Sequence, residues 1–479
     1  MNPSANPNVA SPQANNRSSL WVAAAVVVAT LVQLGAQTTI VARTGFLMGD
    51  FRAFYCAARV ASHGADPYLA QPLRACEVAA APTQFFKKNP GVTIPAPLPG
   101  YAIAALVPLS FAPFAVAAAI WSALLLLAWL ACIVALARFA QAAWPIALAV
   151  VGLSLGVLSL PFGEVVPLAL AFLCLAACRA WQRRWRAAAL FAAAAMIEPH
   201  LALPACIALA IWAPATRWPL VLSAAVLGAL SLAFLGPATN LEYFTSVLPS
   251  HALSEATRDT QYSLTGVLSS MGTPASVALR AGTGWYLAML ALGAVIAGRL
   301  TRKTGNAAFL VCAPLAFAVF GGTFIHITQI AAALPAALLS VSHAKQPARN
   351  FTVAALLALA VPWGWVVSPA LILAPAVPVG FLAWRYWGEN LSAVLLAALA
   401  AALLVFGLGQ LYTVHSARIA TYASAPAIDA RLAEASWSEY SRAGSGASLA
   451  AWAVRLPTWL GLALLLGLLA GEARAVEAR

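Results

Sequence analysis

The chain has 479 residues, of which 62% are hydrophobic and only 9% are charged, and its mean hydropathy is +0.85. These values exclude an ordinary soluble domain and indicate an all-α polytopic membrane protein, because backbone groups in lipid must bond within their own helix. The net charge of +13 does not indicate nucleic-acid binding, since excess Lys and Arg in a membrane protein anchor the cytoplasmic loops.

In chain order, a polar tail at 1–18 precedes one transmembrane body at 19–470, and a short charged tail at 471–479 follows it. We expect both tails to be cytoplasmic and the first to be disordered. Three long loops, 42–98, 237–283 and 412–450, are expected on the outer side. About 12–14 crossings are predicted from apolar stretches at 19–41, 99–115, 117–137, 145–161, 165–178, 187–197, 200–213, 218–236, 284–298, 306–321, 325–341, 351–367, 369–384, 390–411 and 451–470.

Basic clusters set the orientation. The segments 179–186, 299–303, 343–349 and 472–479 are short, positive and adjacent to apolar stretches, so we expect them to be cytoplasmic. Counting from the N-terminus agrees with this only if one stretch between 99 and 161 does not cross. The stretch 99–115 is the candidate, because its prolines favour a re-entrant or oblique helix.

The segment "MGDFRAFYCAARVASHGADPY" (48–68) predicts a helix with Asp50 at its N-cap and Gly64 just after its end. Its aromatic residues fall on one face, whereas Arg52, Arg59 and His63 lie nearer the other. This pattern is typical of an amphipathic helix lying on the membrane surface. On that basis alone, Asp50 could be only a helix cap, and the two arginines could contact lipid phosphate.

Ionisable residues gather where apolar stretches end on the outer side: Asp50, Glu164, Glu198, His200 and His326. Charged groups at a membrane are costly and therefore indicate function. A transporter would place them near the bilayer midplane, so this distribution favours chemistry at the outer face. The alternative for each residue is a purely structural turn.

The cysteines show no metal-ligand spacing. Five lie in apolar stretches and are expected to be core residues. Cys56 and Cys76 share the first outer loop, where they could form a disulfide if that loop is periplasmic, and the sequence alone leaves this open.

Several motifs follow one another in a familiar order: "GDFRAFYCAARVASHGADPY", "PAPLPGYAIAALVPLSFAP", "PFGEVVPL", "IEPHLALP", "NLEYFTSVLP" and "TQYSLTGVL". Over roughly 19–345 the chain resembles glycosyltransferase family 87, a group of mannosyltransferase-like membrane enzymes with the GT-C fold. The first loop carries the strongest part of the resemblance.

The resemblance implies inverting transfer of a mannose-like sugar from a polyprenyl-phosphate donor to a lipid or glycan acceptor. It places the active site at the periplasmic face of the bacterial inner membrane. It implies that Asp50 is the catalytic base and that His326 helps to bind the donor phosphate. Arg52 and Arg59 suit the same phosphate. We expect Tyr55, Glu164, Glu198, His200 and Gln261 to line the substrate pocket.

Two positions depart from the family pattern. Glu164 follows Gly163 where the family has Gln and then an Asn, and Glu198 stands where a Lys precedes the proline. We expect no cofactor and no metal site; a divalent ion bridging Glu198 to phosphate is compatible with the sequence, but no ligand spacing requires it. The alternatives are a transporter or flippase of lipid-linked sugars and a non-catalytic protein of envelope assembly.

Overall fold

The computed structural model describes residues 16–152, 154, 159–256, 261–361, 363, 432–444 and 449–474. These residues form helices and no strand, which confirms the predicted all-α class. Five of the helical segments are long and apolar enough to cross a membrane, so the chain is a multi-pass membrane protein. The predictions for 1–15, 369–384 and 390–411, and for the part of the loop 412–450 at 412–431 and 445–448, lie outside the described residues.

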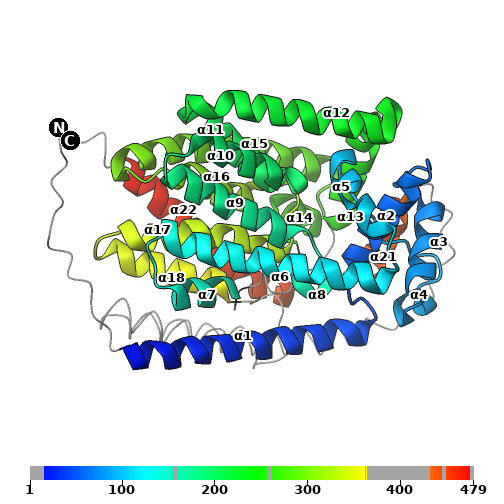
Figure 1. Ribbon diagram of the computed structural model, residues 1–479, viewed down its shortest axis with the longest axis horizontal. Helices are drawn as coiled ribbons and strands as arrows, with labels where there is room; N and C mark the ends of the chain where they lie inside the picture. Colours follow the sequence, from blue (N-terminus) through cyan, green and yellow to red (C-terminus); the bar gives the residue numbers. More distant parts are fainter. Residues whose placement is uncertain are drawn as a thin grey trace.

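The long helices run roughly parallel to one another and form a bundle (Figure 1). The bundle helices are α1 (Asn16–Thr44), α6 (Phe114–Phe139), α7 (Trp144–Gly152), α9 (Val166–Trp181), α10 (Trp185–Ala194), α11 (Pro199–Trp212), α12 (Arg217–Glu242), α15 (Ala275–Thr304), α16 (Phe309–Gly321), α17 (Leu334–His343), α18 (Ala348–Ala360) and α22 (Leu449–Arg474).

Shorter helices gather at one end of the bundle, and we call the first six of them the end layer (Figure 1). The end layer consists of α2 (Gly49–Ser62), α3 (Ala70–Ala80), α4 (Gln84–Lys88), α5 (Gly100–Ser110), α13 (Leu248–Glu255) and α21 (Ala433–Gly444). Four other short helices accompany it: α8 (Ser159–Phe162), α14 (Leu264–Ser270), η4 (Tyr243–Val247) and η5 (Ile327–Ala333). Two more, η2 (Ala195–Ile197) and η3 (Pro214–Thr216), lie within the bundle. The predicted outer loops 42–98 and 237–283 are therefore largely helical.

The centre of the bundle is α16, which is buried along almost its whole length. It packs against α9, α11 and α15. Close approach depends on small residues: a Cβ added at Gly293 of α15 would lie 2.9 Å from the Phe317 Cβ. Small residues at helix contacts are typical of membrane bundles, where dispersion contacts replace the hydrophobic effect.

Two helices border opposite edges of the bundle, α1 and α12 (Figure 1). Both expose large apolar side chains, including Leu31 and Val32 on α1 and Leu222 and Leu230 on α12. Exposed apolar faces of this length suit contact with lipid tails. The apolar stretch predicted at 218–236 ends at a break in α12, where Gly236 has φ +75°.

The basic clusters lie together at the end of the bundle opposite the end layer. Arg183 donates to the Gly305 carbonyl at 2.8 Å, and Lys303 donates to the Glu472 carbonyl at 2.8 Å. The loop before α10 thus lies beside the C-terminal ends of α15 and α22. The helix α22 continues to Arg474, so the predicted tail at 471–479 begins later than expected.

The stretch 99–115 does not form a single long helix. The helix α5 ends at Ser110 and a turn leads into α6 at Phe114. Eleven residues rise only about 16 Å, which is too short to cross. The structure therefore agrees with the prediction that this stretch is not a full crossing.

The helix α2 is not an amphipathic helix on the membrane surface, and that prediction was wrong. Eleven of its 14 residues are buried, and the helix packs against α3 and α5. Its N-cap is Met48, with φ 54°, so Asp50 lies in the first turn rather than at the cap. The predicted stop is correct, because the helix ends at Ser62 and Gly64 has φ +77°.

Cys56 of α2 and Cys76 of α3 form a disulfide with a Cα–Cα distance of 5.6 Å. It joins two helices of the end layer that are separated by 20 residues in sequence. Disulfides persist mainly outside the cytoplasm. The sequence left open whether Cys56 and Cys76 pair, and in the structure they do.

We expect the double substitution Cys56→Ala and Cys76→Ala to reduce the unfolding free energy by about 3 kcal/mol, because opening a loop of this length increases the entropy of the unfolded chain. Thermal unfolding of the purified protein in detergent measures the effect. A reductant should lower the unfolding temperature of the wild type and leave that of the double variant unchanged. Equal responses of the two proteins would contradict the prediction.

Candidate active site

A cavity of about 1560 Å³ lies between the end layer and the bundle. It is lined by residues of α1, α2, α13, α15 and α21 and by the turns before α9, α11 and η5. The turns bring one end of each of several short apolar helices to the same place. Asp50, Glu164, Glu198, His200 and His326 all line this cavity, as their shared position at outer ends predicted.

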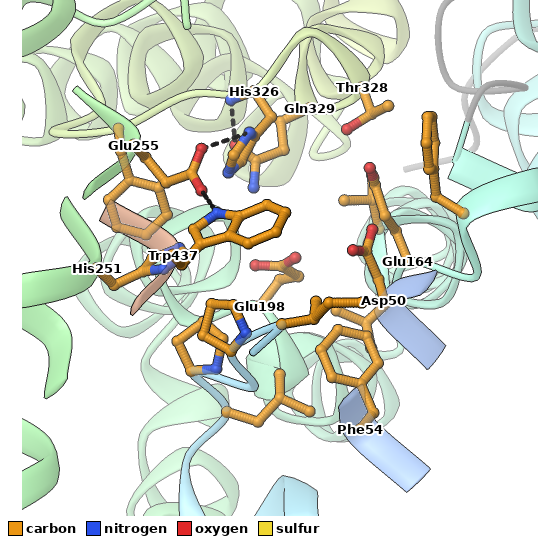
Figure 2. A pocket seen from close by; sticks show the side chains of 18 of the residues that line it. Asp50, Phe54, Glu164, Glu198, His251, Glu255, His326, Thr328, Gln329 and Trp437 are labelled. Carbon is orange, nitrogen blue, oxygen red and sulfur yellow. Dashed lines mark hydrogen bonds and ion pairs between the residues drawn. The ribbon is translucent and has the colours of Figure 1, made fainter. Parts of the chain in front are cut away.

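The carboxyl groups of Asp50 and Glu164 lie on one side of the cavity, with Glu198 between them and a cluster of His251, Glu255, His326 and Trp437 (Figure 2). Asp50 is only partly buried, so its carboxyl group is accessible from the cavity. Phe54, one turn later on α2, lines the same wall. A carboxylate reachable from a large cavity is positioned to act on a bound molecule.

Glu164 is placed by an unusual backbone. Gly163 has φ +76°, and a Cβ added there would lie 2.6 Å from the Phe51 Cβ. The Gly163 carbonyl also accepts a hydrogen bond from Trp121 Nε1 at 2.9 Å. The tight fit between this turn and α2 fixes Glu164 relative to Asp50.

Gly163→Ala is expected to destabilise the protein by about 1–3 kcal/mol, because a residue with a Cβ is strained at positive φ. The added Cβ also clashes with Phe51, so α2 must shift. Gly64→Ala is the matched control, since Gly64 has a similar φ and nothing lies within 4 Å of an added Cβ. Thermal unfolding of the two variants separates the cost of backbone strain from the cost of the clash with Phe51. A Gly64→Ala variant that is as unstable as Gly163→Ala would show that packing against α2 contributes nothing.

Glu198 and His200 flank Pro199 at the break between η2 and α11, and their side chains lie 3.4 Å apart. The His200 carbonyl accepts from the Tyr286 hydroxyl at 3.0 Å, which ties this turn to α15. The His200 ring also contacts Phe324. These contacts hold an acid and a base side by side at the cavity wall.

His326 is positioned from behind by Gln261. The two residues form an isolated antiparallel bridge, and the Ile325 amide donates to Gln261 Oε1 at 2.9 Å. Gln261 Nε2 lies 3.4 Å from His326 Nδ1. The sequence predicted that Gln261 lines the substrate pocket. In the structure Gln261 is buried and does not line the cavity, and it supports His326 instead.

Three other predicted site residues also lie away from the cavity. Tyr55 is buried and donates from its hydroxyl to the Ala112 carbonyl at 2.9 Å. Arg59 is exposed and donates to that Tyr55 hydroxyl at 3.1 Å. Neither residue lines the cavity, because both lie on a face of α2 turned from Asp50.

Arg52 is the third, and its placement is the largest departure from expectation. It is 1% exposed, and its guanidinium lies over the rings of Phe86 and Phe114. Burial raises the pKa of the nearby Glu77 carboxyl well above its usual range, and the positive charges of Arg52 and Arg74 oppose that shift. Arg52 thus compensates a buried acid within the end layer and does not face a donor phosphate.

The sequence interpretation missed His251, Glu255 and Trp437. Trp437 Nε1 donates to Glu255 Oε1 at 2.7 Å, and His251 Nδ1 lies 3.1 Å from Glu434 Oε2. These bonds attach α21 to α13 although nearly two hundred residues separate them in sequence. The four-residue spacing of His251 and Glu255 was a usable signal, because it places both on one helix face.

Residues 99–321 match the model of glycosyltransferase family 87. The match confirms the resemblance over this central segment and indicates a glycosyltransferase. It includes Glu164, Glu198, His200, His251 and Glu255 of the cavity, whereas Asp50 and His326 lie outside it. Comparison with curated proteins found no match, and comparison with solved structures found none either.

Proposed function

We propose that this chain transfers a mannose-like sugar, with inversion, from a polyprenyl-phosphate donor to a lipid or glycan acceptor at the periplasmic face. The observation that carries the proposal is the convergence of Asp50, Glu198 and His326 on one cavity. These residues come from three segments that are far apart in sequence. Their shared position supports a single reaction centre.

The reaction requires little of the protein beyond a base and an environment for the leaving phosphate. The acceptor hydroxyl oxygen attacks the anomeric carbon, and the bond from that carbon to the phosphate oxygen breaks. The hydroxyl proton passes to the Asp50 carboxylate, and the polyprenyl phosphate leaves on the opposite face of the sugar. His326, across the cavity, is suited to stabilise the charge of that phosphate.

The walls of the cavity suit a donor with a hydrocarbon chain. Ile40 and Val41 of α1 and Leu279 of α15 line it, and both helices are candidate membrane spans. Apolar side chains therefore continue from the polar cluster to the helices that meet lipid. A polyprenyl chain can lie along such a surface while its phosphate reaches the polar end.

The orientation rests on two independent features. The basic clusters lie at the end of the bundle opposite the cavity, and positive loops are typically cytoplasmic. The Cys56–Cys76 disulfide lies at the cavity end, and disulfides are typical of the oxidising side. Both support a periplasmic cavity in the bacterial inner membrane.

The test is a transfer assay with the purified protein in proteoliposomes and a radiolabelled polyprenyl-phosphate mannose. We expect labelled sugar to move to an acceptor in a membrane extract, with inverted configuration at the anomeric carbon. Lipid profiling of a deletion strain supplies the acceptor, because the unmodified species accumulates. Retention of configuration, or transfer only from a nucleotide sugar, would contradict the proposal.

A further inference from the structure

Three side chains with metal-binding atoms meet at one wall of the cavity. His251 and Glu255 lie four residues apart on α13, and His326 comes from the turn before η5. One ligand atom of each lies within 4.8 Å of the other two. Two side chains at this helical spacing point the same way, as in known metal sites built on one helix.

Neighbouring side chains orient His251 and Glu255, and Figure 2 shows Glu255 between Trp437 and His326. Glu434 contacts His251 Nδ1 at 3.1 Å, so Nε2 is the His251 nitrogen suited to coordination. Trp437 bonds Glu255 Oε1, and Oε2 of the same carboxylate lies 3.7 Å from His326 Nδ1. A carboxylate behind a histidine is the usual second layer of a metal site.

The cavity is rich in carboxyl groups, so a bound cation would offset their negative charge. Among the described lining residues are four carboxylic acids, Asp50, Glu164, Glu198 and Glu255, and only one lysine, Lys88. A phosphate entering this acidic cavity meets repulsion unless positive charge compensates it. Arg52 does not supply this charge, because its guanidinium lies over the Phe86 and Phe114 rings and the residue does not line the cavity.

We propose that His251, Glu255 and His326 bind one divalent transition-metal ion, with Zn²⁺ the best fit, whose open position faces the cavity and takes an anionic oxygen. Two histidines and one glutamate with a fourth position open are a known ligand set for zinc. The three atoms must move inward by less than about 1 Å to reach coordination distance. Only the identity of the anion, the donor phosphate, rests on the proposed function.

Metal content of the purified protein tests the site without any sugar donor. After incubation with Zn²⁺ and removal of free ion, we expect one equivalent per chain in the wild type and less than a tenth in Glu255→Gln and in His251→Ala. His63→Ala is the matched control, since His63 is exposed and lies outside the cavity, and it should keep the full equivalent. Mn²⁺ is the second probe, for a site that prefers oxygen ligands.

The substitution Glu255→Gln also removes a bond partner of Trp437, so its folding is checked by thermal unfolding without metal. In addition, Zn²⁺ should raise the unfolding temperature of the wild type and of His63→Ala but not that of Glu255→Gln. Co²⁺ bound in place of Zn²⁺ should give visible absorption typical of nitrogen and oxygen ligands. A wild type that binds neither Zn²⁺ nor Mn²⁺, or a Glu255→Gln variant that keeps its metal, would overturn the proposal.

The role of the ion is separated from the proposed function by a chelator. Removal of the metal should reduce sugar transfer at least tenfold, and added Zn²⁺ or Mn²⁺ should restore it. Transfer that a chelator leaves unchanged in metal-depleted protein would overturn the phosphate-binding role. Absence of transfer under all conditions, with metal bound normally, would instead contradict the proposed glycosyltransferase reaction and leave the metal site intact.

Discussion

Replacement of Asp50 by asparagine is expected to reduce the rate of sugar transfer by about 10³-fold, which is typical of losing a general base. Asparagine has nearly the same shape as aspartate but cannot accept the acceptor hydroxyl proton at neutral pH. Asp50 lies in the first turn of α2 and lines the cavity while most of the helix is buried elsewhere, so the exchange should leave the fold intact. The measurement is the initial rate in proteoliposomes at saturating donor.

The control for this prediction is Asp66→Asn in the same loop. Asp66 Oδ1 accepts a hydrogen bond from the Tyr68 amide at 2.9 Å and does not line the cavity. Its transfer rate should stay within about threefold of the wild type, because an amide oxygen can accept the same bond. If Asp50→Asn kept more than a tenth of the wild-type rate, another group would have to be the base.

Replacement of Arg52 by methionine is expected to lower the unfolding free energy by about 3–5 kcal/mol, the usual cost of leaving a buried charge without its partner. Glu77 is fully buried, and the positive charge of Arg52 favours its ionised form, a support that the methionine variant removes. Methionine keeps the length and much of the volume of the arginine stem but provides no charge above the Phe86 and Phe114 rings. Thermal or denaturant unfolding in detergent measures the loss.

Arg59→Met provides the comparison, since Arg59 lies two turns later on the same helix and is exposed. It should change the unfolding free energy by less than about 1 kcal/mol. At a temperature where Arg52→Met is folded, its KM for the donor should equal that of the wild type. A normal unfolding temperature combined with a raised KM would restore Arg52 to the phosphate-binding role that the sequence favoured.

Sequence patterns predicted the place of the site better than its components. The outer turns at Glu164, Glu198 and His326 had to meet at one face, because each joins short apolar helices whose other ends carry basic loops. That argument needs only hydropathy and charge, which local sequence contains. The positions of the turns along the cavity wall then follow from helix packing.

The direction of individual side chains could not be predicted in this way. Arg52 looked exposed because polar residues usually face water, but its partners Phe86, Phe114 and Glu77 lie in other segments. His251 and Glu255 lie in the stretch that we interpreted as an outer loop, so their four-residue spacing was not interpreted as helical. The catalytic role of Asp50 and the phosphate-binding role of His326 stay predictions until the variants are measured.

The position of α21 late in the chain bears on how the protein is made. Asp50 emerges from the ribosome long before Glu434 and Trp437, which complete the wall at His251 and Glu255. Ser436 also accepts from the Thr93 amide at 2.9 Å, so the same helix closes on the first loop. The cavity therefore stays incomplete until α21 has been made, and a chain truncated before residue 433 would lack one wall of the cavity.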